Sequence, residues 1–195
     1  MIAIVDYGAG NLTSVVKAVQ HLGRECAVTR DPDIVGRAKK WIIPGVGNFK
    51  ATAPLVNGAL GEVLRGGVAD RPLLGICLGL QWMFEGSSEA PELRGLGTFT
   101  GQCVRFSEQV KSPHVGWDSI AINHSSRLLA GIPSGAYVYF THSYRAPLCT
   151  DTVATCSYEE PFTAVAERGN SFGVQFHPEK SGDVGLQMLE NFCAL

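Results

Sequence analysis

The first half of the chain alternates apolar runs with amphipathic segments. Residues 2–7 (IAIVDY) start with a continuous apolar run, which is typical of a strand buried on both faces of a sheet. From about residue 11 to 22, apolar side chains recur on one helical face, and we predict Asn11 as the N-cap and Gly23 as the stop. These residues therefore predict a strand followed by a crossover helix.

The same alternation continues along the first 85 residues. It predicts further strands at 25–30, 40–44 and 72–76 and helices at 58–66 and 78–85. Strands that alternate with helices are typical of an α/β fold with a parallel sheet, although the pattern leaves the strand order open.

From about residue 97 the hydrophobic pattern changes to shorter runs that are typical of strands. We predict six of them, at 98–106, 116–122, 136–144, 152–158, 162–168 and 171–176. They indicate an antiparallel or mixed extension of the sheet. A last helix, at 182–192, is expected to pack back onto the sheet. Without repeats or linkers, residues 1–195 are predicted to form one compact α/β domain.

Composition narrows the class of protein. The chain has 195 residues, 45% of them hydrophobic, and a net charge of −2 without any basic run, so we expect no nucleic-acid partner. The start, MIAIVDYGAG, lacks a basic segment and turns polar after a few apolar residues, so we expect neither a signal peptide nor a membrane anchor. These features favour a cytoplasmic protein.

The six cysteines fit reduced thiols better than a disulfide framework. The chain is long for a disulfide scaffold, and no Cys-x-x-Cys motif occurs. We therefore expect no structural metal site, and most of the thiols should be small buried hydrophobes.

Cys77 lies in the segment LGICLGLQ, where a predicted strand runs into a predicted helix. Glycines two residues before and after it, Gly75 and Gly79, suit the tight strand-to-helix turn of a nucleophile elbow. Such a turn exposes the nucleophile, and the helix start favours thiolate over thiol. The alternative is a buried cysteine on a strand that happens to be rich in glycine.

A second motif, FGVQFHPE, ends a predicted strand with a histidine and a carboxylate. Residues i and i+2 of an extended segment point the same way, so Glu179 could orient His177 while His177 takes a proton from Cys77. An exposed His-Pro-Glu turn is the alternative, and His142 is the competing base.

A third motif, PGVGNF at residues 44–49, follows the predicted strand at 40–44. Its glycines allow backbone N–H groups to face a ligand and act as oxyanion donors. Alternatively it is only a strand-to-helix turn, and it does not complete a dinucleotide-binding G-x-G-x-x-G.

Together these motifs resemble the glutaminase subunits of imidazole glycerol phosphate synthases, a branch of the class I glutamine amidotransferases. The resemblance runs from residue 2 to the C-terminal helix, and Leu80 replaces the Met of many relatives. The motifs that carry it are IVDYGAGNL, PGVGNF, GICLGLQ, PHVGW, YFTHSY and GVQFHPEKS.

The resemblance implies a single flavodoxin-like class I glutamine amidotransferase domain that hydrolyses L-glutamine without a metal or organic cofactor. It assigns Cys77, His177 and Glu179 to a catalytic triad, Gly45, Val46, Gly47 and Leu78 to the oxyanion hole, and Gln81, Ser143 and Tyr144 to substrate binding.

The resemblance also implies a heterodimer with a (β/α)8-barrel cyclase subunit that receives the ammonia. Trp117, Tyr139 and Lys180 match positions near that contact, although core aromatic residues and a solvated charge are the alternatives. Two further readings stay open from sequence: a silent binding subunit that keeps the elbow for packing, and an active paralogue that feeds ammonia to another acceptor.

Overall fold

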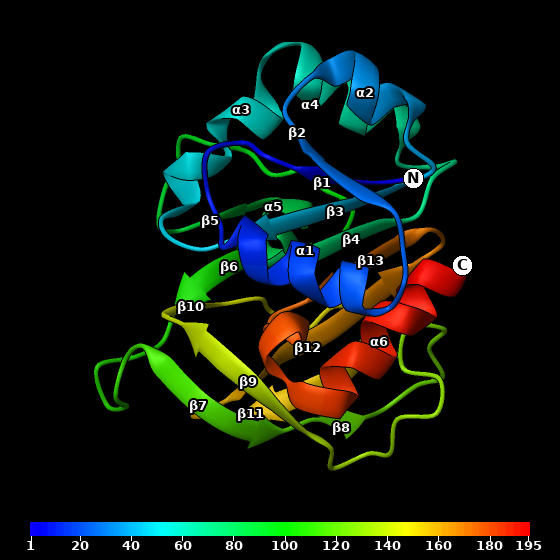
Figure 1. Cartoon of the computed structure of the whole chain (residues 1–195). Coiled ribbons are helices and arrows are strands. Elements are labelled where there is room, and N and C mark those ends of the chain that lie inside the picture. The colour runs from blue at the N-terminus through cyan, green and yellow to red at the C-terminus, as the bar shows by residue number, and fades with distance from the viewer.

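The computed structural model describes residues 1–195, and its centre is an eight-stranded sheet with the order β2-β1-β3-β4-β13-β12-β11-β8 (Figure 1). The strands are β1 (Ile2–Val5), β2 (Cys26–Thr29), β3 (Lys40–Gly45), β4 (Leu73–Cys77), β8 (Ala121–Ile122), β11 (Thr152–Ser157), β12 (Pro161–Arg168) and β13 (Ser171–Val174). Neighbours from β2 to β13 are parallel, and those from β13 to β8 are antiparallel. The predicted parallel sheet with an antiparallel extension is confirmed.

Helices cover both faces of the parallel strands because these strands are apolar on both sides. In β1, Ile2 and Ile4 belong to one buried cluster, and Ala3 and Val5 belong to another. The first cluster includes side chains of α1 and α6, and the second those of α2, α3, α4 and α5. The helices are α1 (Leu12–His21), α2 (Pro32–Arg37), α3 (Ala53–Val56), α4 (Gly58–Gly67), α5 (Leu78–Met83) and α6 (Gly182–Ala194).

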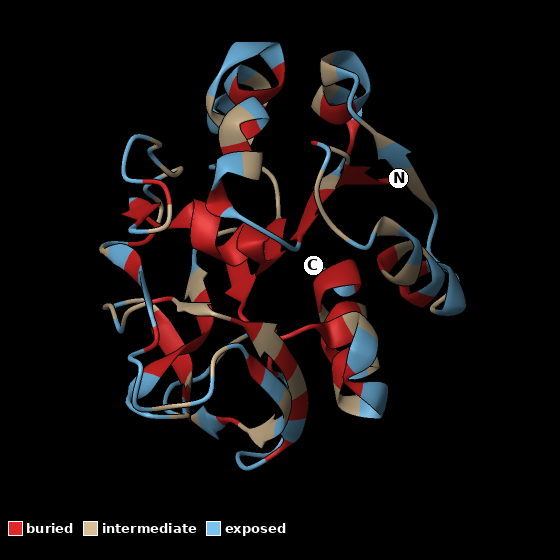
Figure 2. Ribbon diagram, turned by 90° about the vertical axis from the view of Figure 1, so that its left-hand side faces the viewer, coloured by how far each residue is buried: buried red, intermediate tan, exposed pale blue.

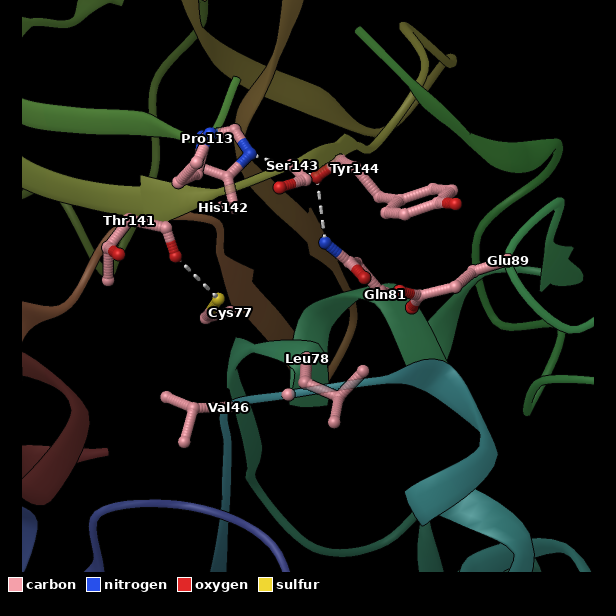
Figure 3. Close-up of a pocket in the computed structure, with 11 residues that line it drawn as sticks. Val46, Cys77, Leu78, Gln81, Glu89, Pro113, Thr141, His142, Ser143 and Tyr144 are labelled. Carbon is pink, nitrogen blue, oxygen red and sulfur yellow. Dashed lines mark hydrogen bonds between the residues drawn. The ribbon is translucent and has the colours of Figure 1, made fainter.

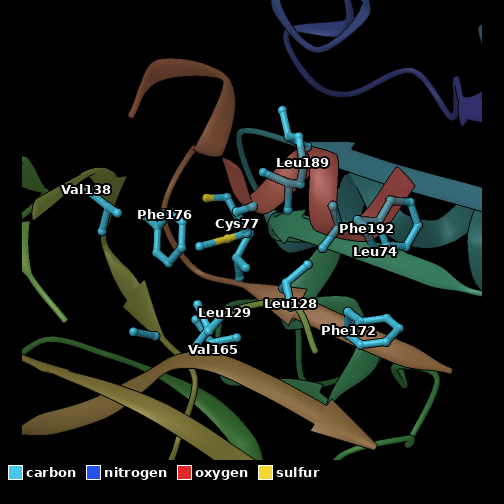
Figure 4. Close-up of a cluster of buried hydrophobic side chains, with 14 of the residues drawn as sticks. Leu74, Cys77, Leu128, Leu129, Val138, Val165, Phe172, Phe176, Leu189 and Phe192 are labelled. Carbon is cyan, nitrogen blue, oxygen red and sulfur yellow. The ribbon is translucent and has the colours of Figure 1, made fainter. Parts of the chain in front are cut away.

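The burial pattern follows from these two layers. The central strands are almost entirely buried, whereas the outer turns of the helices are exposed (Figure 2). Figure 4 shows part of the first cluster, in which Phe172, Phe176 and Phe192 are drawn with Cys77. None of the helices has the length and apolar character that a membrane span requires.

Two small sheets lie beside the main one. One contains β5 (Gly86–Ser87), β6 (Gln102–Arg105) and β10 (Tyr144–Arg145). The other, which we call the β7–β9 ribbon, pairs β7 (His114–Ser119) with β9 (Tyr137–His142) in antiparallel register. This ribbon brings residues about halfway along the chain to the edge of the candidate site.

Several predicted boundaries were wrong. The run at 98–106 contains only β6, because Gly101 has φ +105° and interrupts the extended backbone. The run at 116–122 divides at Ile120, since β7 pairs with β9 whereas β8 joins the main sheet. The short helices α2 and α3 were missed because they are too brief to show helical periodicity.

Candidate active site

Three parallel neighbours, β3, β4 and β13, end on the same side of the sheet and bring the three motifs together. Gly45 at the end of β3 is in register with Cys77 at the end of β4, and β13 leads into His177. The carboxyl ends of parallel strands are the usual place for a ligand site in an α/β fold. The strand order, which the sequence left open, therefore brings the three motifs together.

Cys77 occupies a strained turn. It is the one non-glycine residue with positive φ, at 54°, and helix α5 begins at the next residue. Such a conformation costs about 1–3 kcal/mol and persists only where the surroundings enforce it. The turn therefore has the geometry of a nucleophile elbow.

The two glycines around Cys77 are required by close backbone contacts. A Cβ on Gly75 would lie 2.6 Å from the Gly79 carbonyl group, and one on Gly79 would lie 1.9 Å from the Ile43 carbonyl oxygen. No side chain fits at either position without moving the backbone. These contacts explain the glycine spacing that marked the elbow in the sequence.

His177 and Glu179 form a buried pair rather than an exposed turn. Nδ1 of His177 lies 2.8 Å from Oε1 of Glu179, and both side chains are 2% exposed. Burial alone lowers the pKa of His177, but its interactions with Cys77 and Glu179 outweigh burial and raise the pKa to about 10. Nε2 of His177 makes no regular hydrogen bond within the chain, so it is free to exchange a proton with the neighbouring Cys77.

A cavity of about 260 Å³ opens beside Cys77 (Figure 3). It is lined by Val46, Gly47, Cys77, Leu78, Gln81, Glu89, Pro113, Thr141, His142, Ser143 and Tyr144. Seven of the residues predicted for the oxyanion hole, the substrate or the triad are therefore in its wall. Gly45, His177 and Glu179 do not line the cavity.

Two of the predicted substrate-binding residues, Gln81 and Tyr144, are linked by a hydrogen bond. Nε2 of Gln81 donates to the Tyr144 carbonyl oxygen at 2.9 Å (Figure 3). The same nitrogen lies 3.4 Å from Oε1 of Gln175. The bond to Tyr144 joins α5, which follows the elbow, to β10, the strand that comes directly after the β7–β9 ribbon in the chain. It fixes one wall of the cavity against the other.

Gln175 and Glu89 are among the residues of the site that the sequence prediction missed. Nε2 of Gln175 donates to the Cys77 sulfur at 3.7 Å. Glu89 is the one acidic residue in the cavity wall. Gln175 stands two residues before His177, so the alternation of an extended segment could have indicated it. Glu89 carries no local signal, because only the tertiary fold brings it to the cavity.

His142 is poorly suited to the role of competing base. Its Nδ1 lies 2.9 Å from the Tyr144 carbonyl oxygen, so this nitrogen must donate, and its Nε2 faces Nδ1 of His114 at 3.3 Å. Burial lowers the pKa of His142 to about 3. Both ring nitrogens are engaged, and the ring stays neutral at physiological pH.

Trp117, Tyr139 and Lys180 lie together outside the cavity. The Trp117 and Tyr139 rings are 6.1 Å apart, and Nζ of Lys180 is 5.8 Å from the Tyr139 ring centre. Trp117 is 55% exposed, so it is not a core aromatic residue. With the exposed Val115 and Tyr137, these three residues form what we call the ribbon patch.

Comparisons with known proteins agree with this architecture. The family model for class I glutamine amidotransferases matches residues 3–195. A crystal structure of a glutamine amidotransferase superposes with a TM-score of 0.77 at 18% identity, covering 98% of each chain, which indicates the same fold.

Relatives with higher identity point to one branch of this family. The HisH subunit of imidazole glycerol phosphate synthase from Thermococcus kodakarensis is 46% identical over 100% of both chains. The HisH subunit from Yersinia pseudotuberculosis is 42% identical over 100% of this chain and 99% of its own. The chain therefore belongs to the class I glutamine amidotransferases, in the branch of the imidazole glycerol phosphate synthase HisH subunits.

Proposed function

We propose that residues 1–195 act as one amidotransferase domain, the glutaminase half of an imidazole glycerol phosphate synthase. It hydrolyses L-glutamine to glutamate and ammonia, and the ammonia passes to a (β/α)8-barrel cyclase subunit for histidine biosynthesis. Membership of the HisH branch supports this reaction. The six free cysteines support a reducing cytoplasmic location.

In the first half of the reaction, the Cys77 thiolate attacks the carboxamide carbon of glutamine. The raised pKa of His177 supports an imidazolium beside this thiolate, and the Gln175 amide donates toward the sulfur. The oxyanion of the tetrahedral intermediate accepts hydrogen bonds from backbone N–H groups of Leu78 and of the Gly45–Gly47 loop. The C–N bond then breaks, His177 protonates the departing nitrogen, and ammonia leaves a γ-glutamyl thioester on Cys77.

In the second half, water hydrolyses the thioester. His177, now neutral, takes a proton from water as the oxygen attacks the thioester carbon. Collapse of the intermediate breaks the C–S bond, releases glutamate and restores the Cys77 thiolate and the His177 imidazolium. Glu179 holds the imidazole through Nδ1 in both halves.

The cavity wall supplies partners for the rest of the substrate. The Glu89 carboxylate is the complement of the α-ammonium group of glutamine, and Gln81, Ser143 and Tyr144 line the same space. The hydrogen bond from the Gln81 amide nitrogen to Tyr144 fixes the orientation of the amide group, and the Gln81 amide oxygen can accept from the substrate.

The ribbon patch is the proposed contact with the cyclase subunit. It gathers exposed apolar side chains beside the cation Lys180, which is the composition expected of a protein interface core with a charged rim. A partner is needed because ammonia released to neutral solvent becomes mostly ammonium, which is not a nucleophile.

The observation that carries the proposal is the strained Cys77 turn beside the buried His177–Glu179 pair. The test is Cys77→Ala in complex with the cyclase subunit. We expect glutamate release to fall by at least about a hundredfold, since the nucleophile is lost. Synthesis from added ammonium salts should remain, because the cyclase chemistry does not use Cys77.

Cys156→Ala, which removes another buried thiol, is the matched control and should retain glutamate release. Cys77→Ala with more than about a hundredth of wild-type glutamate release would remove Cys77 from the nucleophile role.

A further inference from the structure

The Ser181 hydroxyl joins the strand that carries the ribbon patch to the turn that carries His177. Its oxygen accepts from the Tyr139 backbone N–H at 3.0 Å and donates to the His177 carbonyl oxygen at 2.7 Å. The His177 backbone N–H donates to the Tyr139 carbonyl oxygen at 2.9 Å. These three bonds close a ring between β9 and the turn.

The ring has the form of an antiparallel pair with one hydroxyl inserted. In a regular pair, Tyr139 and His177 would exchange both N–H···O bonds directly. Here one bond is direct, and the other passes through the Ser181 hydroxyl. Ser181 is 2% exposed, so water has little access to replace the hydroxyl.

The short turn between His177 and Ser181 carries two functions at once. Its residues form a 3-10 turn, Pro178–Lys180, in which Glu179 faces His177 and Lys180 extends over the Tyr139 ring. A movement of the ribbon patch at Tyr139 or Lys180 therefore acts on the backbone that also holds the His177–Glu179 pair. The Ser181 hydroxyl closes the base of this turn.

We propose that Ser181 is a positioning residue that couples the ribbon patch to His177. It transmits partner binding by holding the His177 backbone in a fixed relation to β9, and it takes no part in the chemical steps. This inference rests on the proposed function, because it assumes that the cyclase subunit binds the ribbon patch and stimulates glutamine hydrolysis.

The test is Ser181→Ala, measured by glutamate release from the isolated chain and from its complex with the liganded cyclase subunit. Loss of one buried hydrogen bond, and an unpaired Tyr139 N–H, should lower the stimulated kcat by about tenfold. KM for glutamine and the Kd for the cyclase subunit should stay within about twofold of wild type, because Ser181 lines neither the cavity nor the exposed ribbon patch. The ratio of stimulated to basal activity should fall accordingly.

Two further variants separate coupling from general damage. Ser181→Thr keeps the hydroxyl and should recover most of the stimulation, whereas Ser181→Cys, with a weak S–H donor, should lie between alanine and wild type. Ser126→Ala is the matched control, since the Ser126 hydroxyl also accepts from a backbone N–H, that of Leu129, but lies on another segment. It should leave the stimulation ratio unchanged.

Stimulated kcat of Ser181→Ala within about twofold of wild type would overturn the inference, and so would an equal fall of basal and stimulated activity. If Ser181→Ala does not fold, Ser181→Cys with wild-type stimulation overturns it instead. A wild-type complex without any stimulated glutamate release would remove the proposed function and this inference together. A stimulated wild type beside an equally stimulated Ser181→Ala would remove this inference alone.

Discussion

The parallel strands and the β7–β9 ribbon face the same cavity, but they differ in how their geometry is maintained. On the parallel side, Cys77 is held by contacts within a few residues, such as those between Gly75 and Gly79. On the ribbon side, the cavity wall depends on bonds between distant positions, such as Gln81 with Tyr144 and His114 with His142. The turn at Cys77 is therefore determined mostly by nearby residues, with Gly79 also packed on Ile43 of β3, whereas the opposite wall of the cavity forms only in the tertiary fold.

This difference suggests a division of work between the two regions. The ends of β4 and β13 supply the groups proposed to react, and close backbone contacts at Gly75 and Gly79 leave little room around Cys77. The ribbon supplies one wall of the substrate cavity and the exposed patch for the partner. Substitutions on the parallel side should therefore change the chemical steps, and those on the ribbon should change binding and coupling.

The largest effect that tests this division is within the His177–Glu179 pair. His177→Asn removes the proton carrier and should lower the stimulated kcat by about 10²–10⁴-fold. Glu179→Gln leaves the imidazole in place and only weakens its orientation, so the loss should be smaller. The measurement is glutamate release by the complex at saturating glutamine. A loss for Glu179→Gln that equals or exceeds that of His177→Asn would contradict the assigned roles.

The next effect concerns the loop after β3. Gly47 has φ +106°, and a Cβ there would meet no neighbour, so Gly47→Ala tests backbone conformation without adding a clash. We expect the stimulated kcat to fall by about 10–100-fold, because one oxyanion donor is worth about 10²–10³ in rate and alanine disfavours the required turn. The Kd for the cyclase subunit should not change.

The same loop is expected to act as a switch. The isolated wild-type chain should be nearly inactive, and the liganded partner should favour the loop state with its donors turned toward the site. Full glutaminase activity of the isolated chain would show that the loop does not control the reaction.

On the ribbon side, Trp117→Ala should weaken binding of the cyclase subunit by about 30-fold, or about 2 kcal/mol, as expected for an aromatic residue at the centre of an interface. Basal glutamate release should not change, since Trp117 does not line the cavity. Val28→Ala is the control, because Val28 is 45% exposed on β2, at the opposite edge of the main sheet. Equal affinity of the Trp117 and Val28 variants in titration calorimetry would exclude the ribbon patch as the contact.

A separate test uses the pH dependence of stability, to which the histidines of the two regions contribute with opposite signs. The folded-state pKa of His177 is raised to about 10, so its stabilising contribution is complete below pH 6.5 and is lost as the pH rises toward 10. The pKa of His142 is lowered to about 3, so stability falls as the pH drops below 6.5. Denaturant unfolding at a series of pH values measures both.

Asparagine at either position should reduce the slope on one side of this profile, because other groups with shifted pKa values, such as His114 on the acidic side and Cys193 on the alkaline side, also contribute. His177→Asn should reduce the alkaline slope and leave the acidic slope, and His142→Asn should do the reverse. If either variant changes both sides equally, the assignment of one histidine to each side is wrong.

The features that could be predicted from the sequence are those that depend on residues close together in the chain. The alternation of apolar strands and amphipathic helices indicated the parallel sheet, and the glycines around Cys77 indicated the elbow, because each depends on residues near one another in the chain. His177 and Glu179 were also found as a pair, since only one residue separates them.

What the sequence could not predict required pairing over long separations. The division of 116–122 between two sheets depends on which strands β7 and β8 find as partners. Glu89 reaches the cavity, and Ser181 meets Tyr139, only after the chain has folded. The ribbon residues Trp117 and Tyr139 came from family resemblance, and local periodicity would have left them as possible core positions.

The central claim is that Cys77 is the nucleophile of a glutaminase, and covalent trapping tests it most directly. The complex with the liganded cyclase subunit is treated with an electrophilic glutamine analogue, and the adduct is located by intact-mass and peptide mass spectrometry. The account predicts one adduct per chain, on Cys77, together with loss of glutamate release and retention of synthesis from ammonium salts. An adduct on another of the six cysteines, or full glutaminase activity after modification of Cys77, would contradict it.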